Sequence, residues 1–209
     1  MRRGRVGYRW ILYVVFLLAV VLLVFIFHPS FRGIRVKQVT DGDTIVLKDG
    51  EVVRYIGIDT PEQDHPFCRE ATQANREMLE AGKIRLEYDR DRRDRYGRIL
   101  AYVWVDTLML NAELIRRGLA SVYLFSPNLT YRERFIDLQR EARLKKAGIW
   151  SIPVEPESYY VASRTSQRFV FHRPDCRSAK RIKKENSIRF ETREEALDSG
   201  YSPCRNCKP

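Results

Sequence analysis

The longest apolar run of the chain spans residues 10–27, WILYVVFLLAVVLLVFIF, and holds no charged residue, no glycine and no proline. About 20 apolar residues are needed to cross the hydrocarbon core of a bilayer. The run is apolar on every helical face, unlike the one-sided pattern of a helix on a soluble core. We therefore predict a transmembrane anchor over residues 10–27, preceded by a basic flank over residues 1–9.

A cleaved signal peptide is the alternative interpretation of this run. The apolar region of a signal peptide is usually shorter and is followed by small residues at the cleavage site, whereas HPSFR follows here. Four arginines precede the run, so the positive-inside rule predicts a cytoplasmic N-terminus and a soluble part outside the cytoplasm. Three basic residues just beyond the run, Arg32, Arg35 and Lys37, oppose this orientation.

After residue 33 the pattern changes to short strands and amphipathic helices. Strands and extended segments are predicted over residues 34–47, 52–58, 83–88, 99–105 and 119–125. Helices are predicted over residues 67–81, 111–117 and 130–148, each of which meets a glycine at its end. The third helix is expected to begin with a capping box formed by Thr130 and Glu133.

About five strands with interspersed helices suit a small closed barrel of the OB type. We therefore predict an α+β, mainly β domain over residues 34–150, with about three helices. Residues 151–168 contain two prolines and show little periodicity, which predicts a linker. Residues 169–209 are too few to bury a large core, so a metal is the expected staple of this module.

Charge is unevenly placed along the chain. The net charge is +11, with about +6 in residues 1–35, −1 in residues 36–159 and +6 in residues 160–209. Basic ends suit a polyanion, either nucleic acid or an anionic membrane surface, although they also serve solubility.

Candidate chemistry is concentrated in residues 39–62, VTDGDTIVLKDGEVVRYIGIDTPE. Asp43 opens one predicted strand and Asp59 ends the next, with Asp49-Gly50 as the turn between them. An antiparallel pair of this kind brings the two carboxylates to one rim. Carboxylates at one rim form a hard-oxygen site suited to Ca²⁺ or Mg²⁺, although either aspartate alone is also typical of a turn.

Several motifs together resemble the staphylococcal nuclease (thermonuclease) family. They are DGDT at residues 41–44, Arg54, DTPE at residues 59–62, and DRYGRILAYV at residues 94–103, in the family's order. The resemblance covers roughly residues 34–150. It implies a five-stranded OB barrel with three helices, Ca²⁺ as the metal, DNA and RNA as substrates, and 3′-phosphate products.

The resemblance also implies roles for individual residues. Catalysis falls to Arg54 and Arg98 as phosphate clamps and to Glu62 as general base, and a guanidinium matches phosphate with paired donors. The calcium ligands would be Asp43, Asp59 and the Thr60 carbonyl.

Four further residues match family positions around this site. Asp41 is expected to support the metal ligands, whereas the expected substrate contacts are Arg95, Tyr96 and Tyr123.

Two features depart from the family pattern. Phe125 stands where the family enzyme has a tyrosine, so one hydroxyl is missing. The segment between Glu62 and Glu70 is shorter than the mobile loop of the family enzyme. Both departures bear on substrate preference and leave the proposed metal ligands and arginines intact.

The C-terminal module has the spacing of a zinc site. Cys204-x-x-Cys207 is a metal-knuckle spacing, and His172 with Cys176 supplies a second pair. Residues 169–209 resemble the zinc-binding N-terminal domain of the Ada DNA-repair methyltransferase. In that family four cysteines bind zinc and the first accepts a methyl group. His172 stands at that first position, so we expect a structural zinc module that docks on DNA and not the repair reaction.

A disulfide between Cys204 and Cys207 is the alternative to zinc, since an oxidising exterior favours it.

For the whole chain we predict a membrane-anchored, extracytoplasmic, calcium-dependent nuclease with a zinc module. The competing interpretation is a catalytically silent barrel that tethers nucleic acid to the membrane, which would not need all five of Asp43, Arg54, Asp59, Glu62 and Arg98. A role of the basic ends on anionic lipid would not explain the carboxylates.

Overall fold

The computed structural model describes residues 13–17, which are helical, and residues 33–209. The predicted flank over residues 1–9 and most of the predicted anchor over residues 10–27 therefore lie outside the described residues. Within the described part of the chain, no helix has the length and apolar character needed to span a bilayer. Residues 34–209 form one contact unit, which is described by itself below.

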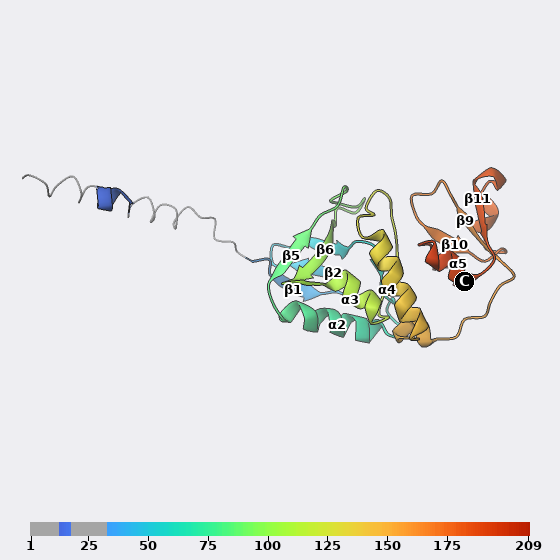
Figure 1. Cartoon of the computed structure of the whole chain (residues 1–209), viewed down its shortest axis with the longest axis horizontal. Coiled ribbons are helices and arrows are strands. Elements are labelled where there is room, and N and C mark those ends of the chain that lie inside the picture. Colours follow the sequence, from blue (N-terminus) through green and yellow to red (C-terminus); the bar gives the residue numbers. More distant parts are fainter. Residues whose placement is uncertain (1–12, 18–32) are drawn as a thin grey trace, which may run out of the picture. The chain divides into compact units, whose positions relative to one another are not determined.

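The first half of this unit is built on one curled sheet (Figure 1). Its strands are β1 (Val36–Val39), β2 (Thr44–Leu47), β3 (Val52–Tyr55), β5 (Ile84–Glu87), β6 (Ile99–Val105) and β7 (Leu108–Met109). Their order is β1-β2-β3-β6-β5, with β7 paired to β6, and only the β3–β6 pair is parallel. A bridge between Ile34 and Ile84 joins the two edges of this sheet. The sheet therefore curls round an apolar interior, because its first and last strands meet.

The hairpin of β2 and β3 forms as the turn signal predicts. Gly50 has a φ of 92°, a conformation that glycine adopts without strain. Ile45 pairs with Val53 across this hairpin, and both side chains are fully buried. The predicted strand over residues 34–47 is interrupted after β1, because residues 41–43 bend before β2 begins at Thr44.

Three helices pack with this sheet: α2 (Cys68–Glu80), α3 (Leu110–Arg116) and α4 (Arg132–Leu144) (Figure 1). Their apolar faces join one core with the strands, to which Ala71, Leu114 and Phe135 contribute buried side chains. The extended segment predicted over residues 119–125 contains only the short strand β8 (Ser121–Val122), which pairs with β4 (Ile58–Asp59).

The predicted capping box of the third helix is wrong. Tyr131 occupies the N-cap position of α4, and no side chain caps the helix. The Thr130 amide donates instead to Asp89 Oδ2 at 3.1 Å, and Glu133 pairs with Arg132. Thr130 is thus held by a contact with Asp89, and it does not cap the helix as the local pattern predicts.

The second half of the unit is a smaller sheet with one helix. Its elements are β9 (Tyr160–Ser163), β10 (Val170–His172), β11 (Ser187–Phe190), α5 (Arg193–Asp198) and β12 (Ser202–Pro203), with short 3₁₀ turns at Gly148–Ser151, Ala179–Arg181 and Lys184–Asn186. The strand order is β11-β9-β10-β12, and β10 and β12 are parallel. The predicted linker over residues 151–168 therefore contains β9, an inner strand of this sheet, so the segment is a structural part of the module.

The C-terminal module packs on α4 and β8 through polar and apolar contacts. Ser202 Oγ donates to the Val122 carbonyl at 2.6 Å, and Arg132 Nη2 donates to the Ser199 carbonyl at 2.9 Å. A Cβ added to Gly200 would lie 2.9 Å from Ile136 Cδ1, so the two surfaces approach closely. These contacts hold the module against the end of the strand that carries Asp59.

Candidate active site

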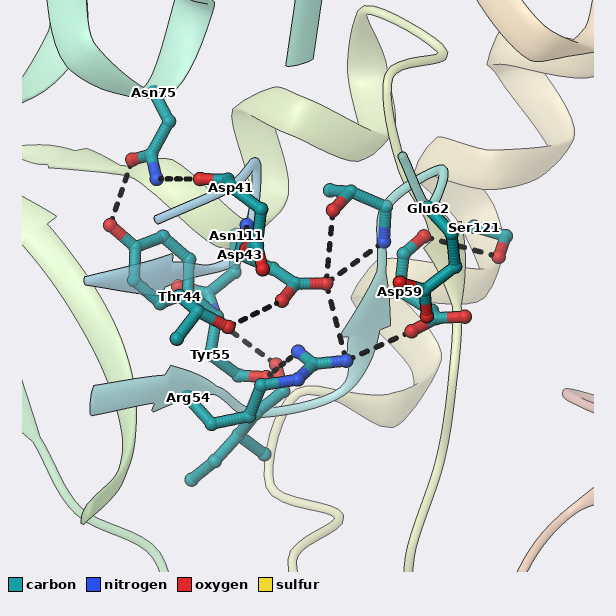
Figure 2. A network of polar contacts seen from close by, with 12 residues as sticks. Asp41, Asp43, Thr44, Arg54, Tyr55, Asp59, Glu62, Asn75, Asn111 and Ser121 are labelled. Atoms are coloured by element: carbon teal, nitrogen blue, oxygen red, sulfur yellow. Dashed lines mark hydrogen bonds and ion pairs between the residues drawn. The ribbon is translucent and has the colours of Figure 1, made fainter. Parts of the chain in front are cut away.

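Two acidic side chains and one arginine meet at the ends of β2, β3 and β4. Figure 2 shows the Arg54 guanidinium between Asp43 and Asp59, with its Nη2 atom 3.2 Å from Asp43 Oδ2 and 3.0 Å from Asp59 Oδ1. Arg54 Nη1 donates to the Tyr55 carbonyl at 2.8 Å, which fixes the plane of the guanidinium. The hairpin and the short β4 strand thus bring together three residues that are up to 16 positions apart.

Asp43 is the most buried member of this group, with a relative exposure of 5%. Its Oδ2 accepts from the Thr60 amide at 2.9 Å and from the Thr60 hydroxyl at 3.2 Å. Its Oδ1 accepts from Thr44 Oγ1 at 3.0 Å (Figure 2). Its own amide donates to Asp41 Oδ1 at 3.0 Å. The Asp43 carboxylate is therefore held in one orientation by the turn that precedes it and the strand end opposite.

The buried, closely spaced carboxylates make this site favourable for a cation. Burial raises the pKa of Asp59, while Arg54 and Arg205 lower that pKa and Asp43 raises it. Burial and the neighbouring Asp43 carboxylate also raise the pKa of Asp41. Since ionised carboxylates so close together repel one another, a cation among them relieves a cost that the fold imposes.

The donor set at this rim fits calcium. Asp43 and Asp59 present hard carboxylate oxygens, as Ca²⁺ prefers, and Asp41 stands directly behind Asp43. Thr60 is fixed between the two acids by its amide and hydroxyl contacts with Asp43, which leaves its carbonyl as the proposed third ligand.

The remaining predicted residues line the same pocket as Asp43 and Asp59. They are Arg54, Glu62, Arg95, Tyr96, Arg98 and Tyr123. The Arg98 guanidinium is held by Asp94, with Nη2 and Nε both 2.7 Å from Asp94 Oδ2. The Arg95 guanidinium lies 4.7 Å from the centre of the Tyr96 ring, which is 68% exposed. One concave surface thus joins buried acids to an exposed aromatic and cationic wall.

Glu62 lies on the exposed side of the acids, with 60% of its side chain accessible. Its Oε1 atom accepts from Arg205 Nη1 at 2.6 Å, and Arg205 also pairs with Asp59. An exposed carboxylate at the mouth of the pocket can exchange protons with water, which a deeply buried one cannot do readily.

A second site lies in the C-terminal module, where four side chains converge. The ligand atoms of His172, Cys176, Cys204 and Cys207 all lie within 4.8 Å of one another, and Cys176 Sγ is 3.6 Å from His172 Nδ1. Zinc bonds of about 2.3 Å to sulfur and about 2.0 Å to nitrogen in a tetrahedron put such atoms about 3.6 Å apart. The parallel pairing of β10 with β12 brings the two halves of this site together.

The protonation of this second site also suits zinc. The four cysteines of the chain, all within the described residues, are free thiols. Burial lowers the pKa of His172, which favours the neutral imidazole that binds metals. Burial raises the pKa of Cys207 to about 12, so this thiol ionises at neutral pH only beside a bound cation. Zinc is supported over a disulfide because all four side chains converge, whereas a disulfide would use only two of them.

The chain matches two families and several curated relatives. Residues 52–152 match the staphylococcal nuclease homologue family, and residues 155–209 match the metal-binding domain of Ada. The thermonuclease of Staphylococcus hyicus is 43% identical over 126 residues, which cover 56% of this chain and 75% of that protein. The chain belongs to the staphylococcal nuclease family. The thermonuclease of Staphylococcus intermedius is 44% identical over 55% of this chain and 74% of that protein. Endonuclease YncB of Bacillus subtilis is 39% identical over 63% of this chain and 65% of that protein.

The two family matches together confirm the predicted enzyme class and both predicted cofactors. The staphylococcal nuclease family consists of calcium-dependent phosphodiesterases, so the nuclease domain of this chain is an enzyme of that class and uses Ca²⁺. The match to the metal-binding domain of Ada, together with the cluster of His172, Cys176, Cys204 and Cys207, supports Zn²⁺ as the metal of the C-terminal module. Nucleic acid is the partner common to the two domains.

The sequence did not indicate that two basic residues of the C-terminal module would reach the nuclease pocket. Arg205 and Arg168 come from the C-terminal module and line the nuclease pocket, and the Arg168 guanidinium is 6.0 Å from the centre of the Phe125 ring. Arg205 stands between two zinc-binding cysteines, which marks it as part of a knuckle. No local pattern indicates that it reaches a carboxylate 146 positions away.

Proposed function

We propose that this protein is a membrane-anchored, extracytoplasmic nuclease that hydrolyses phosphodiester bonds of DNA and RNA, with a zinc module that aids DNA binding. The observation that carries the proposal is the single pocket in which Asp43, Arg54, Asp59, Glu62 and Arg98 lie together. A scissile phosphate in this pocket would meet acids on one side and guanidinium groups on the other.

The two arginines act on the charge of the phosphate. Arg54 and Arg98 present paired N–H donors to the phosphate oxygens, whose negative charge increases as the bond to water forms. Tyr55 and Asp94 hold these guanidinium groups in place. Since the donors are oriented beforehand, little reorganisation is needed at the moment of reaction.

Glu62 accepts a proton from the attacking water at the mouth of the pocket. As the new P–O bond forms, the P–O bond to the departing sugar oxygen breaks, and that oxygen takes up a proton from solvent. Asp43, Asp59 and the Thr60 carbonyl would hold Ca²⁺, with Asp41 supporting Asp43. When bound there, calcium supplies Lewis-acid polarisation and charge neutralisation. Tyr96, Tyr123 and Arg95 contact the nucleotide beside the scissile bond.

A nucleic-acid-binding protein without activity is the second candidate function. Such a protein would use the exposed basic and aromatic wall of the pocket but would not need the buried pair of Asp43 and Asp59. Two acids at a phosphate-binding surface repel the phosphate ligand. A protein that only binds nucleic acid therefore has no reason to retain them.

Cleavage of plasmid DNA by residues 34–209 tests the two candidates. With Ca²⁺ we expect nicked and linear products, and with EDTA we expect none. An RNA transcript in parallel tests the second substrate. Retarded migration of intact plasmid in both conditions would support the binding protein and contradict the nuclease.

The location is tested on the full chain with a C-terminal tag in a bacterial host. The charge-free run over residues 10–27 and the arginines before it support a single-pass anchor with the enzyme outside the cytoplasm. We expect the tagged protein to resist carbonate extraction and to be digested by protease added to spheroplasts. Protection from protease in intact spheroplasts, with digestion after lysis, would contradict this orientation.

A further inference from the structure

One side chain of the zinc module enters the nuclease pocket. Arg205 lies between Cys204 and Cys207, and its Nε atom is 3.1 Å from Asp59 Oδ2. Its Nη2 atom donates to Asp59 Oδ1, and its Nη1 atom is 2.6 Å from Glu62 Oε1. A single guanidinium therefore contacts both a proposed metal ligand and the proposed general base.

We propose that Arg205 is a third phosphate-binding arginine of the nuclease site, supplied by the zinc module. This inference rests on the proposed nuclease function. The ligand is a phosphate of the nucleic-acid substrate next to the scissile bond. The zinc module then belongs to the nuclease site and is more than a separate DNA-binding domain.

The chemistry of the contact favours a phosphate-binding role over a fixed ion pair. Arg205 presents a bidentate fork to Asp59, and the same fork fits two oxygens of a phosphate. Its side chain is 56% exposed, so it can move from the carboxylates to an incoming phosphate at little cost in packing. Asp59 keeps Arg54 as a partner at 3.0 Å when Arg205 leaves.

The knuckle holds the backbone of Arg205 at a defined place in the pocket. The Cys204 amide donates to the Phe171 carbonyl at 2.9 Å, and Arg173 Nε donates to the Cys207 carbonyl at 2.9 Å. These two contacts fix both ends of the turn that carries Arg205.

A short path also connects this turn to the acids. Ser202, two residues before Cys204, donates to the carbonyl of Val122 at 2.6 Å, and the preceding residue Ser121 pairs with Asp59 in the two-stranded sheet. The position of the Arg205 backbone relative to Asp59 is thus set by adjacent strands, so the guanidinium needs only side-chain rotation to reach a phosphate.

The test compares Arg205→Ala, Arg205→Lys and Arg177→Ala with the wild type in residues 34–209. Arg177 is an exposed arginine of the same module that lies outside the pocket lining, so its variant is matched in charge. Zinc content per protein is measured for each variant to show that the knuckle is intact. The substrate is a short single-stranded DNA oligonucleotide.

In cleavage assays with Ca²⁺ we expect Arg205→Ala to raise KM about tenfold, as loss of one charge-assisted contact does. The dependence of log KM on log salt concentration should become shallower by about 0.7, the value for one phosphate on a single strand. Arg205→Lys should keep that salt dependence while losing part of the affinity, and Arg177→Ala should match the wild type.

Binding of the same oligonucleotide to the zinc-loaded protein in buffer without Ca²⁺ or chelator, followed by fluorescence anisotropy, separates this inference from the nuclease function. If the wild type does not cut DNA, the proposed function fails, but weaker binding by Arg205→Ala than by Arg177→Ala still supports the phosphate contact. Equal KM and equal binding for the two variants would overturn the inference. Faster cleavage by Arg205→Ala would also overturn it, because Arg205 would then block the carboxylates instead of serving the substrate.

Discussion

At the scale of single residues, the site concentrates charge that the fold holds at a cost. Asp43 is buried, and Asp59 lies within reach of the same Arg54 atom. The guanidinium compensates the pair, yet the pKa of Asp59 stays above its usual value because burial outweighs the arginines. Such residues serve the chemistry at the expense of stability.

Arg98 is predicted to contribute mainly to the rate of the chemical step. Its guanidinium is held by Asp94 at the pocket wall, where it can meet charge that develops on the phosphate. Arg98→Ala should lower kcat by about 100-fold or more, as removal of one preorganised donor does. Plasmid or oligonucleotide cleavage at saturating substrate measures this loss. Arg134→Ala, an exposed arginine of α4, is the control. Full activity of Arg98→Ala would remove it from the catalytic set.

Asp59→Asn is predicted to stabilise the metal-free protein at neutral pH. Because the folded-state pKa of Asp59 is raised, its contribution to stability is present below about pH 4, the unfolded pKa, and is lost as the pH rises through the folded value. The variant should therefore have a higher Tm than the wild type at pH 7 in EDTA, with the difference shrinking towards pH 3.5.

Added Ca²⁺ provides the second arm of this measurement. The wild type should gain about 2.7 kcal/mol at a calcium concentration 100 times its Kd, whereas Asp59→Asn should gain much less. A variant that is less stable than the wild type at pH 7 in EDTA would show that ion pairs with Arg54 and Arg205 outweigh the burial of Asp59.

At the scale of elements, polar side chains inside the core join the helices to the sheet. Asn111 at the start of α3 is fully buried. Its Oδ1 accepts from the Val103 amide at 2.8 Å, and its Nδ2 donates to the Ile56 carbonyl at 2.9 Å. Asn75 of α2 accepts from the Tyr55 hydroxyl at 2.8 Å. The residues flanking the active-site strands are thus anchored from two helices.

Asn111→Ala is predicted to destabilise the fold without changing the chemistry. It leaves a buried amide and a buried carbonyl without partners, which should lower the free energy of unfolding by about 2–4 kcal/mol. Urea denaturation measures this loss, and kcat at low temperature should stay near the wild-type value. Glu77→Ala on the exposed face of α2 is the control and should change stability by less than about 0.5 kcal/mol. A change in Asn111→Ala below that limit would contradict the anchoring role.

At the scale of the whole molecule, the two domains share one pocket. The C-terminal module contacts α4 and β8, and Arg205 and Arg168 from this module line the nuclease pocket. The zinc ligands on either side of Arg205 then become part of what shapes the nuclease site. The pocket is complete only when both domains are folded.

Loss of zinc is predicted to act on the nuclease through Arg205. Cys176→Ser should lower the zinc content and raise KM for an oligonucleotide about tenfold, comparable to Arg205→Ala, since the knuckle no longer holds the arginine. The double variant should be little worse than either single variant, because both remove the same contact. Zinc content and steady-state kinetics with excess Ca²⁺ are measured for the wild type, the two single variants and the double variant. Additive effects of the two changes would show that zinc and Arg205 act independently.

Local pattern predicted much of the fold and of the site. The motifs around Asp43 and Asp59 mark their own strands and turns, so the grouping of these two acids follows from a hairpin and a short return of the chain. Arg98 joins them through the parallel pairing of β3 with β6. The predicted cap at Thr130 and the predicted linker over residues 151–168 are wrong because contacts with other segments decide the conformation there: Asp89 binds the Thr130 amide, and β9 pairs with β10 and β11.

The amino-acid sequence by itself predicted the two domains and, through its family motifs, the acids and arginines of the nuclease site and the four zinc ligands, because each belongs to a short segment with its own pattern or spacing. Only the tertiary structure decided how the domains meet and that Arg205 contacts Asp59 and Glu62. That contact depends on the packing of two surfaces more than 140 residues apart, and no local spacing encodes such a distance.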